Sequence, residues 1–516
     1  SSDEDSGSNN DAPGSDTATR ARRPLSATAR RRQHSDEYSD SNHDAPASTS
    51  QKVVWDTVPQ QNSAKDIPVW QGALPNADDT REPIQYFFDA ELLDTIVQQS
   101  NLYCTQKKKN PNSALRLDQN ELEQFIGTVV YMSVLHLPRS RMYWSSECRL
   151  VPVADVMSRD RWEEIKKFIH FNDNSNMEAN NDKLFKIRPI VDSLLQKFQS
   201  LPQDQMLSID EQMVPFKGRS SLKQYIPKKP HKWGYKIFVL CDTKGLVHSF
   251  DIFTGKTDPV PGEPDIGASG NIVLKLAQVI PGAVNHLLYF DNWFSSLDLF
   301  ATLANKGIPA LGTVQQNRLH GCSFCSDTDM KKKGRGTFEE KKAVVDSAEI
   351  RAVKWFDNRA VSTAQSVSDV ERWDRKLKQK VSVERPSIII LYNTFMGGVD
   401  ALDELIAYYR IQIRSKKYYH RFFFHFVDMV IVNSWLFDDL QKDLLAFRTS
   451  IAQVLSKAIP TLEVCSDAVG HWPVVESGRQ RCKLPNCKGQ TVFRCSKCKV
   501  HLCLNKYNNC FQEFHQ

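Results

Sequence analysis

The 516-residue sequence lacks any apolar run long enough to cross a membrane, so no membrane partner is expected. The closest run, residues 422–437, is interrupted by His425, Asp428 and Asn433 and is therefore predicted to be a buried helix. A strong charge imbalance is also missing, because the formal net charge of +6 does not by itself indicate a nucleic-acid partner. No secretory signal pattern is evident, which favours a reduced compartment in which cysteines bind metals.

Large apolar residues are almost absent from the first 66 residues, which are mainly Ser, Asp, Asn, Pro and Ala. Such a composition cannot offset the entropy of the chain, so residues 1–66 are predicted to be a disordered tail. Basic clusters at residues 20–23 and 30–32 within this tail match a nuclear import signal, and hence a location in the nucleus, or a weak nucleic-acid arm. A solvated tail with neither role is an equal alternative.

What the sequence does contain is a closely spaced set of cysteines and histidines after residue 481. Eight soft or borderline ligands in pairs match two tetrahedral zinc sites, and a segment this short needs metal to fold. Their alternating order predicts a cross-brace that binds two Zn²⁺, with a disulfide knot as the alternative. One site is expected to use Cys482, Cys487, His501 and Cys503, and the other Cys495, Cys498, Cys510 and His515.

The spacing of apolar residues divides the remaining chain. Helical spacing dominates residues 67–205, where Asp118 and Glu121 form a start like a capping box. From residue 206 the pattern changes to strands rich in β-branched and aromatic residues. The expected order is strands at 206–216, 235–241 and 246–254, a helix at 271–279, a strand at 287–291, a helix at 296–306 and a strand at 311–314. This is the order of an RNase H-like sheet, although many other α/β domains share parts of it.

These patterns predict an α/β fold that is interrupted and flanked by other parts. A polar, Lys-rich insertion separates the last strand from a later helix, and its lone pair Cys322 and Cys325 gives little reason to expect zinc there. The predicted parts are the tail (1–66), a helical region in two segments (67–205 and 406–460), an α/β region in two segments (206–316 and 389–405), the insertion (317–388), a linker (461–480) and the cysteine-rich module (481–516).

Three aspartates stand where elements of the predicted sheet begin or end. Asp210 lies in the first strand, Asp291 ends the fourth, and Asp400 opens a helix after a double glycine, with Asp403 one turn later on the same face. An RNase H-like sheet places its first and fourth strands side by side, so these side chains are expected to converge. Clustered carboxylates repel unless a cation neutralises them, and hard oxygen ligands suit Mg²⁺ or Mn²⁺. Singly, each aspartate could instead be a cap or turn residue.

Basic residues follow these aspartates in the sequence, with aromatic residues between them. Cations beside a carboxylate centre suit a phosphodiester backbone, because the cations hold the phosphates while metal ions screen the carboxylates. Any one of these side chains could equally be ordinary solvated surface. The expected DNA contacts are Lys217, Arg219, Lys228, Lys229, Lys232, Arg414, Lys416 and Lys417.

Long motifs around the aspartates carry a family resemblance. The segments SIDEQMVPFKGR, FDNWFSS and GGVDALDELIAYYR resemble the piggyBac transposase family, and the terminal Cys/His module is similar to the cysteine-rich domain of that family. The resemblance covers about residues 80–516. It implies an RNase H-like DDD catalytic domain with an insertion, and a split helical dimerisation and DNA-binding domain. By matching position, Asp210, Asp291 and Asp400 look like the catalytic metal-binding triad, with Asp403 as the accompanying acidic residue.

The function that the resemblance implies is cut-and-paste transposition of double-stranded DNA. Cleavage and joining would proceed at TTAA sites through hairpinned transposon ends, by a homodimer whose cysteine-rich domain reads the terminal inverted repeats. Intact carboxylates favour retained strand cleavage. Two other functions stay open: a domesticated DNA-binding or chromatin protein without transposition activity, and a zinc module that acts as a RING-type ligase or a histone reader.

Overall fold

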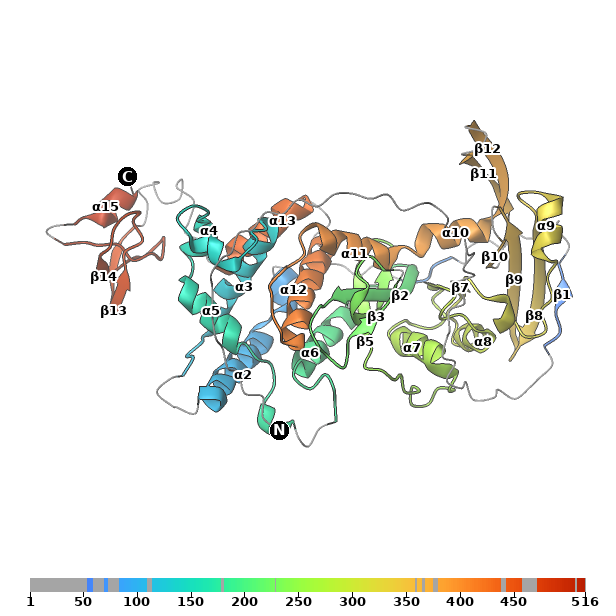
Figure 1. Cartoon of the computed structure of the whole chain (residues 1–516), viewed down its shortest axis with the longest axis horizontal. Coiled ribbons are helices and arrows are strands. Elements are labelled where there is room, and N and C mark those ends of the chain that lie inside the picture. The colour runs from blue at the N-terminus through green and yellow to red at the C-terminus, as the bar shows by residue number, and fades with distance from the viewer. Residues whose placement is uncertain are drawn as a thin grey trace, which may run out of the picture. The chain divides into compact units, whose positions relative to one another are not determined.

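The computed structural model describes twelve segments of the chain, and all of them belong to one compact unit, Ala45–Gln516. Figure 1 labels their helices and strands, numbered in chain order, where there is room. The described residues are 53–58, 69–72, 83–108, 114–177, 181–227, 229–357, 360–363, 367–374, 379–437, 442–456, 471–505 and 508–515. The tail predicted at 1–66 therefore lies outside the described residues, except for 53–58.

A mixed sheet of six strands forms the α/β region. Its strands run in the order β3-β4-β2-β6-β7, with β5 also paired to β4. β2 is antiparallel to β4 and parallel to β6, and β7 is parallel to β6. The predicted order of three strands, helix, strand, helix and strand is confirmed, with the short β3 as an addition. The elements are β2 (Met206–Pro215), β3 (Gln224–Tyr225), β4 (Trp233–Asp242), β5 (Val247–Ile252), α7 (Gly267–Ala277), β6 (Leu287–Phe290), α8 (Leu297–Asn305) and β7 (Ala310–Gly312).

Both faces of this sheet are buried, each against a different core. Side chains of a strand alternate between faces, and β4 shows the alternation directly. Ile237 and Val239 belong to a large core shared with the helical region. Phe238 and Leu240 belong to a second core that includes residues of α7 and α8. Two buried faces explain why the strands of this region read as nearly continuous apolar runs.

Helices from before and after the sheet in sequence share that large core. The capping residue predicted at Asp118 is confirmed, because its carboxylate accepts a hydrogen bond of 2.7 Å from the N–H of Glu121. None of the described helices is long and apolar enough to cross a membrane. The helices are α1 (Pro83–Phe87), α2 (Ala90–Lys108), α3 (Gln119–Val134), α4 (Val151–Ala154), α5 (Arg159–Phe168), α6 (Arg188–Gln199), α12 (Tyr418–Phe437) and α13 (Leu444–Ser456), with 3₁₀ turns η2 (Ser140–Trp144) and η3 (Asn174–Asn176).

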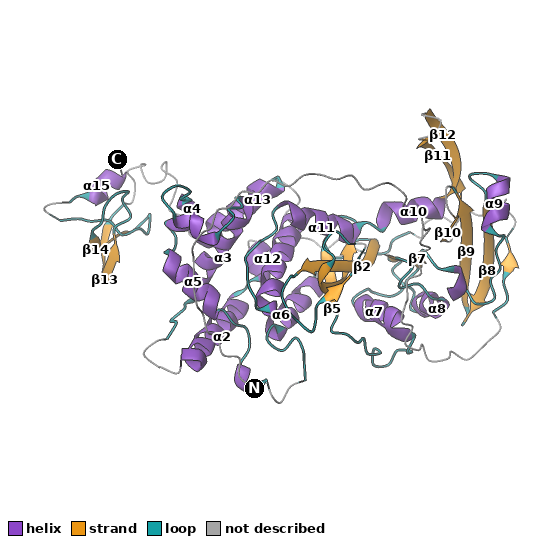
Figure 2. Cartoon of the chain, in the orientation of Figure 1, coloured by secondary structure: helices purple, strands orange, loops and turns teal. Residues whose placement is uncertain are grey.

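The insertion consists mainly of antiparallel strands, drawn in orange in Figure 2. A short strand from the predicted tail, β1 (Asp56–Thr57), pairs with β8 at the edge of this sheet, so the tail is not disordered there. The reason is local apolar burial: Val53 and Trp55 pack against the insertion core, and Trp55 Nε1 donates to the carbonyl of His320 at 3.0 Å. The other elements are η4 (Gln316–Arg318), α9 (Asp327–Lys333), β8 (Phe338–Val345), β9 (Ala348–Phe356), β10 (Ala360–Thr363), β11 (Val367–Asp374) and β12 (Gln379–Pro386).

The cysteine-rich module begins earlier than predicted. The linker was expected to reach residue 480, but β13 (Pro473–Arg481) pairs with β14 (Gln490–Cys495) and so belongs to the module. A six-residue helix, α15 (Cys510–His515), ends the described chain. Residues 457–470, which comprise the end of the predicted helical segment 406–460 and the first half of the predicted linker, lie outside the described residues.

A buried ion pair connects three helices of the helical region. Arg448 of α13 pairs with Asp428 of α12, and each side chain is 1% exposed. Arg448 Nε also donates to Ser133 Oγ of α3 at 2.9 Å, while Asp428 Oδ2 accepts the backbone N–H of Ile411 at 3.0 Å. Because both charges are removed from water, the pair requires these additional hydrogen bonds to be tolerated.

We expect Arg448→Met to destabilise the helical region by about 3–5 kcal/mol, because it leaves the buried Asp428 carboxylate uncompensated. The measurement is the urea midpoint of far-ultraviolet circular dichroism. Arg159→Met, which removes an exposed pair with Asp160, is the control and should leave the midpoint unchanged. Replacing both buried partners, Arg448→Met with Asp428→Leu, should recover part of the loss. An unshifted midpoint in Arg448→Met would contradict the buried placement of the pair.

Candidate functional site

The register of β2 and β6 places Asp210 beside Asp291. In this parallel pair Ile209 lies opposite Phe290. Asp210 directly follows Ile209, and Asp291 directly follows Phe290. Side-chain alternation gives both the same face: Leu207 and Ile209 enter the α7/α8 core, so Asp210 points away from it. The charge of Asp291 contributes to a raised pKa of Asp210, which agrees with their proximity.

A helix on that same face carries the other two aspartates. α11 (Gly398–Tyr408) has Asp400 in its first turn and Asp403 in the next, and α11 packs on β2. A Cβ at Gly398 would lie 2.1 Å from the carbonyl oxygen of Asp242, so glycine permits this close approach. The N-cap of α11 is Gly397, without a side-chain cap. Asp400 therefore does not serve as the N-cap, which was the alternative explanation for it.

The pKa values of three carboxyl groups at this site are raised, mainly by burial. Burial raises the pKa of Asp210 to about 7; Lys229 and the N–H of Glu211 oppose this shift, and the charges of Glu211 and Asp291 add to it. Burial also raises the pKa of Asp291 and of Asp403, and the charge of Asp400 raises the latter further. Carboxylates that raise one another's pKa lack full compensation by protein cations. Their oxygen donors therefore fit a divalent cation such as Mg²⁺ or Mn²⁺.

Asp291 also has an ordinary structural role, because its Oδ1 accepts the N–H of Trp293 at 2.8 Å. The aspartates are less tightly grouped than the terminal cysteines: they do not form a set of three with all ligand atoms within 4.8 Å among the described residues. This spacing is compatible with two cations roughly 3.5–4 Å apart, whose ligands spread over a wider region than those of one ion.

Several residues around the aspartates were not predicted from the sequence. Tyr392, in α10 (Ser387–Phe395), lies near three of them: burial raises its pKa to about 12, and the charges of Asp291, Asp210 and Asp400 contribute. Glu211 pairs with Lys236 at 3.3 Å beside the site.

Gln212 and His425 form a second unpredicted group. Gln212 Nε2 donates to Asp403 Oδ1 at 2.9 Å, and Gln212 Oε1 lies 2.7 Å from His425 Nε2. Period-two alternation from Asp210 could have identified Gln212, since both residues share one face of β2. Nothing local in the sequence indicates His425, because its position depends on how α12 packs against the sheet.

The predicted DNA contacts differ in their surroundings. Lys229 donates to the carbonyl of Glu211 at 2.8 Å and so lies at the acidic site. Lys417 is half-buried and donates to the carbonyl of Lys167 at 2.6 Å; burial and then neighbouring lysines lower its pKa to about 8. Lys228 lies outside the described residues. The remaining five, Lys217, Arg219, Lys232, Arg414 and Lys416, are exposed.

Two groups of ligand atoms come together in the terminal module. In each group the four atoms lie within 4.8 Å of one another. The groups alternate along the chain, so the cross-brace arrangement is present. The first group is His471, Cys495, Cys498 and His515, and the second is Cys482, Cys487, Cys503 and Cys510.

The spacing of these atoms fits tetrahedral zinc. Zn–S bonds of roughly 2.3 Å give sulfur–sulfur edges of about 3.8 Å. Cys487 Sγ lies 3.9 Å from Cys503 Sγ and 3.6 Å from Cys510 Sγ. The ring of His515 is oriented as in many metal sites, because Nδ1 lies 2.6 Å from the Phe511 carbonyl while the buried Nε2 has no hydrogen-bond partner among the described residues.

The predicted pairing of these ligands was wrong at two positions. His501 belongs to neither group. Its backbone forms an isolated antiparallel β-bridge with Arg494 of β14, and its Nε2 lies 3.2 Å from a carboxylate oxygen of Glu476. Cys510 was assigned to the same ion as His515, but five residues of helix rotate the chain by about 140° from one to the other. They consequently face different groups. His471, within the predicted linker, completes the group of His515.

Comparison with known proteins identifies the family. The family profile described as Transposase IS4 matches residues 81–435. PiggyBac transposable element-derived protein 3 of Homo sapiens is 32% identical over 465 residues, which covers 84% of this chain and 76% of the relative. The chain belongs to the piggyBac family of transposases. A second human member, PiggyBac transposable element-derived protein 2, is 31% identical over 485 residues, covering 87% of this chain and 80% of its own length.

A solved structure of the same family shares the fold. The cryo-EM structure of the piggyBac transposase synaptic complex with hairpin DNA matches with a TM-score of 0.60 and 21% identity. The match covers 82% of this chain and 94% of the other chain. The fold of this piggyBac family member is therefore that of a piggyBac transposase.

We expect the full chain to bind two Zn²⁺ and His471→Ala to retain about one, because His471 belongs to one of the two ligand groups. His501→Ala, a histidine of the same module outside both groups, is the matched control and should retain two. Zinc content per chain by inductively coupled plasma mass spectrometry checks both. Loss of zinc from His501→Ala with full retention in His471→Ala would restore the pairing first inferred from the sequence.

Proposed function

We propose that this piggyBac family member is a divalent-cation-dependent DNA transposase that cleaves and joins strands by a cut-and-paste route. The observation that carries the proposal is the convergence of Asp210 and Asp291, on adjacent parallel strands, with Asp400 on the helix packed over them. The strand order supports an RNase H-like catalytic domain, and the raised pKa values of the half-buried Asp210 and Asp291 support a cation site.

Asp210, Asp291 and Asp400 would hold Mg²⁺ or Mn²⁺, with Asp403 as an accompanying carboxylate. When bound, such ions activate a water or a 3′-hydroxyl and stabilise the leaving oxygen in phosphoryl transfer. The protein itself supplies the arrangement: β2 and β6 fix two carboxylates, and the start of α11 fixes the third. Asp210, Asp291 and Asp403 are half-buried, which strengthens the charge interactions among them, whereas Asp400 is exposed.

The surface next to the site is suited to a polyanion. Residues 212–241 contain no Asp or Glu and seven Lys or Arg residues. Within this stretch Tyr225 and Trp233 lie opposite each other on β3 and β4, each 50% exposed, with ring centroids 4.7 Å apart. Lys223 lies 4.6 Å above the Trp233 ring. Exposed aromatic rings among lysines are typical of surfaces that contact nucleic-acid backbones and bases.

Further features of the proposal follow from family membership. We infer terminal inverted repeats as the DNA that the zinc module reads, TTAA as the target, hairpinned ends as intermediates and a homodimer as the working assembly. A nuclear location also stays a prediction, because the basic clusters at 20–23 and 30–32 lie outside the described residues.

A second candidate function is DNA or chromatin binding without transposition. The observation that favours it is the naming of the two human relatives as transposable element-derived proteins. The two functions share a DNA-binding surface and differ in strand cleavage. A donor-plasmid excision assay with the cognate transposon ends separates them, since only the transposase removes the element.

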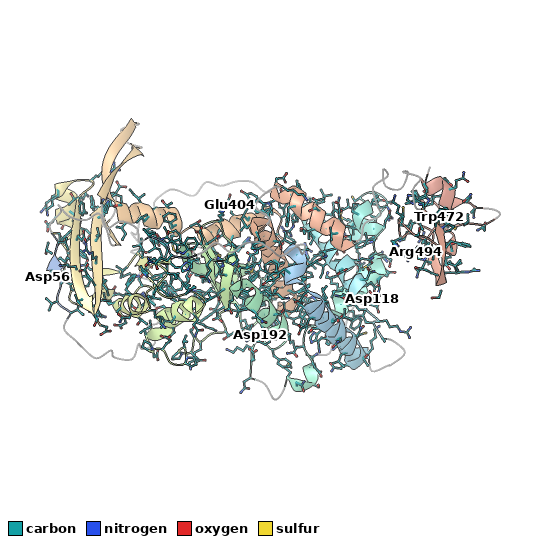
Figure 3. The ribbon with its side chains drawn as sticks, turned by 180° about the vertical axis from the view of Figure 1, so that it is seen from behind. Asp56, Asp118, Asp192, Glu404, Trp472 and Arg494 are labelled. Atoms are coloured by element: carbon teal, nitrogen blue, oxygen red, sulfur yellow. The ribbon has the colours of Figure 1, made fainter. Side chains whose placement is uncertain are left out.

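We expect Asp210→Asn, Asp291→Asn and Asp400→Asn each to reduce cleavage of transposon ends to background, because each removes a charged ligand of the proposed cation. DNA binding should stay near wild type. Glu404→Gln is the matched control: Glu404 is exposed on α11, next to Asp403 in sequence, and is labelled in Figure 3. Nicking and gel-shift assays on the same preparations test this. Wild-type nicking by any one Asn variant removes that aspartate from the triad.

Neutralising the exposed Lys217, Arg219 and Lys232 together should weaken binding to all duplexes alike. Each lost phosphate contact should reduce the slope of log affinity against log salt by roughly one unit. Fluorescence anisotropy at several salt concentrations, with a transposon end and an unrelated duplex, measures both effects. Lys331→Gln, at an exposed site in α9, serves as a control. A loss confined to the transposon end would mean that these residues read bases instead.

A further inference from the structure

The side chain of Asp403 is restrained from the sheet side. Its Oδ1 accepts a hydrogen bond of 2.9 Å from Gln212 Nε2, although the two residues are 191 positions apart. Gln212 is fully buried and shares one face of β2 with Asp210, two residues earlier. The strand that supplies the first carboxylate of the site therefore also holds the fourth one in place.

Gln212 is oriented in turn by a histidine of α12. Its Oε1 lies 2.7 Å from His425 Nε2, and His425 is 4% exposed. An ionised carboxylate only accepts hydrogen bonds, so Gln212 presents its NH₂ group to Asp403 and its oxygen to His425. The proton of the neutral ring must then be on Nε2. The result is a directional chain in which His425 donates to Gln212 and Gln212 donates to Asp403.

These two hydrogen bonds counteract the repulsion between the carboxylates of Asp400 and Asp403. Asp400 and Asp403 stand three residues apart on α11, where side chains share a helix face and like charges repel. A free Asp403 side chain would rotate away from Asp400. The hydrogen bond from Gln212 to Oδ1 restrains this rotation. Partners beyond the direct ligands commonly have this role in metal sites.

We propose that Gln212 and His425 are positioning residues that hold the Asp403 carboxylate in place for the cation site, so that the packing of α12 on β2 sets cation affinity. The inference rests on the proposed function, because it needs a divalent cation at the aspartates. The competing explanation is purely structural: a buried polar contact that attaches α12 to the sheet and contributes only to stability.

The chain offers a matched control for that competing explanation. His420 is on the same helix, is 2% exposed and also makes buried hydrogen bonds, from Nε2 to the Ile169 carbonyl at 3.2 Å and between Nδ1 and Ser415 Oγ at 3.1 Å. None of these partners is an aspartate of the site. His420→Leu should thus cost stability like His425→Leu without changing the surroundings of Asp403.

The decisive pair of variants is His425→Gln and His425→Asn. A glutamine places an amide donor near the position of Nε2, whereas an asparagine places it near Nδ1. Both are polar and of similar stability cost, so they remain comparable even where His425→Leu fails to fold. Gln212→Leu removes the residue that connects His425 to Asp403 and gives an independent measurement.

The experiment titrates the full-length, zinc-loaded protein with Mn²⁺ and follows the free ion by electron paramagnetic resonance. We expect Gln212→Leu and His425→Asn to weaken Mn²⁺ binding by about 10–100-fold, with His425→Gln close to wild type and His420→Leu unchanged. In end-cleavage assays the loss should appear as a higher Mn²⁺ requirement, with most of the rate restored at saturating Mn²⁺.

Three outcomes contradict the inference, and they distinguish a failure of the positioning role from a failure of the proposed function. If Asp210→Asn weakens Mn²⁺ binding but Gln212→Leu and His425→Asn do not, the cation site exists and the positioning role is wrong. Equal losses in His425→Gln and His425→Asn lead to the same conclusion. If the wild-type protein binds no Mn²⁺ that depends on Asp210, the proposed function itself fails, and the inference fails with it.

Discussion

The approach of α11 to the sheet at Gly398 is the contact on which the candidate active site depends. A Cβ there would lie 2.1 Å from the Asp242 carbonyl and 2.5 Å from Ser208 Oγ, so no larger residue fits without displacing the helix. Gly245, with φ of +95°, meets the backbone of Leu402 from the sheet side. Two residues without side chains thus bring helix and strands to nearly backbone contact. The separation of α11 from the sheet therefore determines how closely Asp400 approaches Asp210 on β2 and Asp291 after β6.

Holding these acidic groups together conflicts with their own electrostatics, and the surrounding structure has to resist the repulsion. The resistance comes from rigid neighbours rather than from neutralising every charge. Burial raises the pKa of Asp210 to about 7, and the charges of Glu211 and Asp291 add to this shift while Lys229 opposes it. Behind the site, α12 is attached to α13 and α3 through Asp428 and Arg448. Local strain at a functional site is commonly supported by a well-packed scaffold of this kind.

How much the sequence predicts depends on whether the information is local. Strand alternation is local, and it was enough to predict the order of strands and helices along the chain. The convergence of Asp210 and Asp291 was expected only on the further assumption that this order forms an RNase H-like sheet. The contact of Gln212 with His425 is not local, because it depends on the rotation of α12 about its axis against β2. Likewise Trp55 stands in a polar segment, and a strand forms there because β1 pairs with β8 and because Val53 and Trp55 pack against the insertion core.

The terminal module shows the same limit in its ligand pairing, with a consequence for folding. Each group combines residues from both ends of the segment: His471 with His515, and Cys482 with Cys510. Neither site can form from a continuous local stretch, so an ion bound at either site would close a loop that contains ligands of the other. Loss of one ion would loosen chain that carries ligands of the second, which should lower the affinity of the remaining site without abolishing it. A DNA contact made by β13, β14 or α15 would therefore be weakened by the loss of either ion.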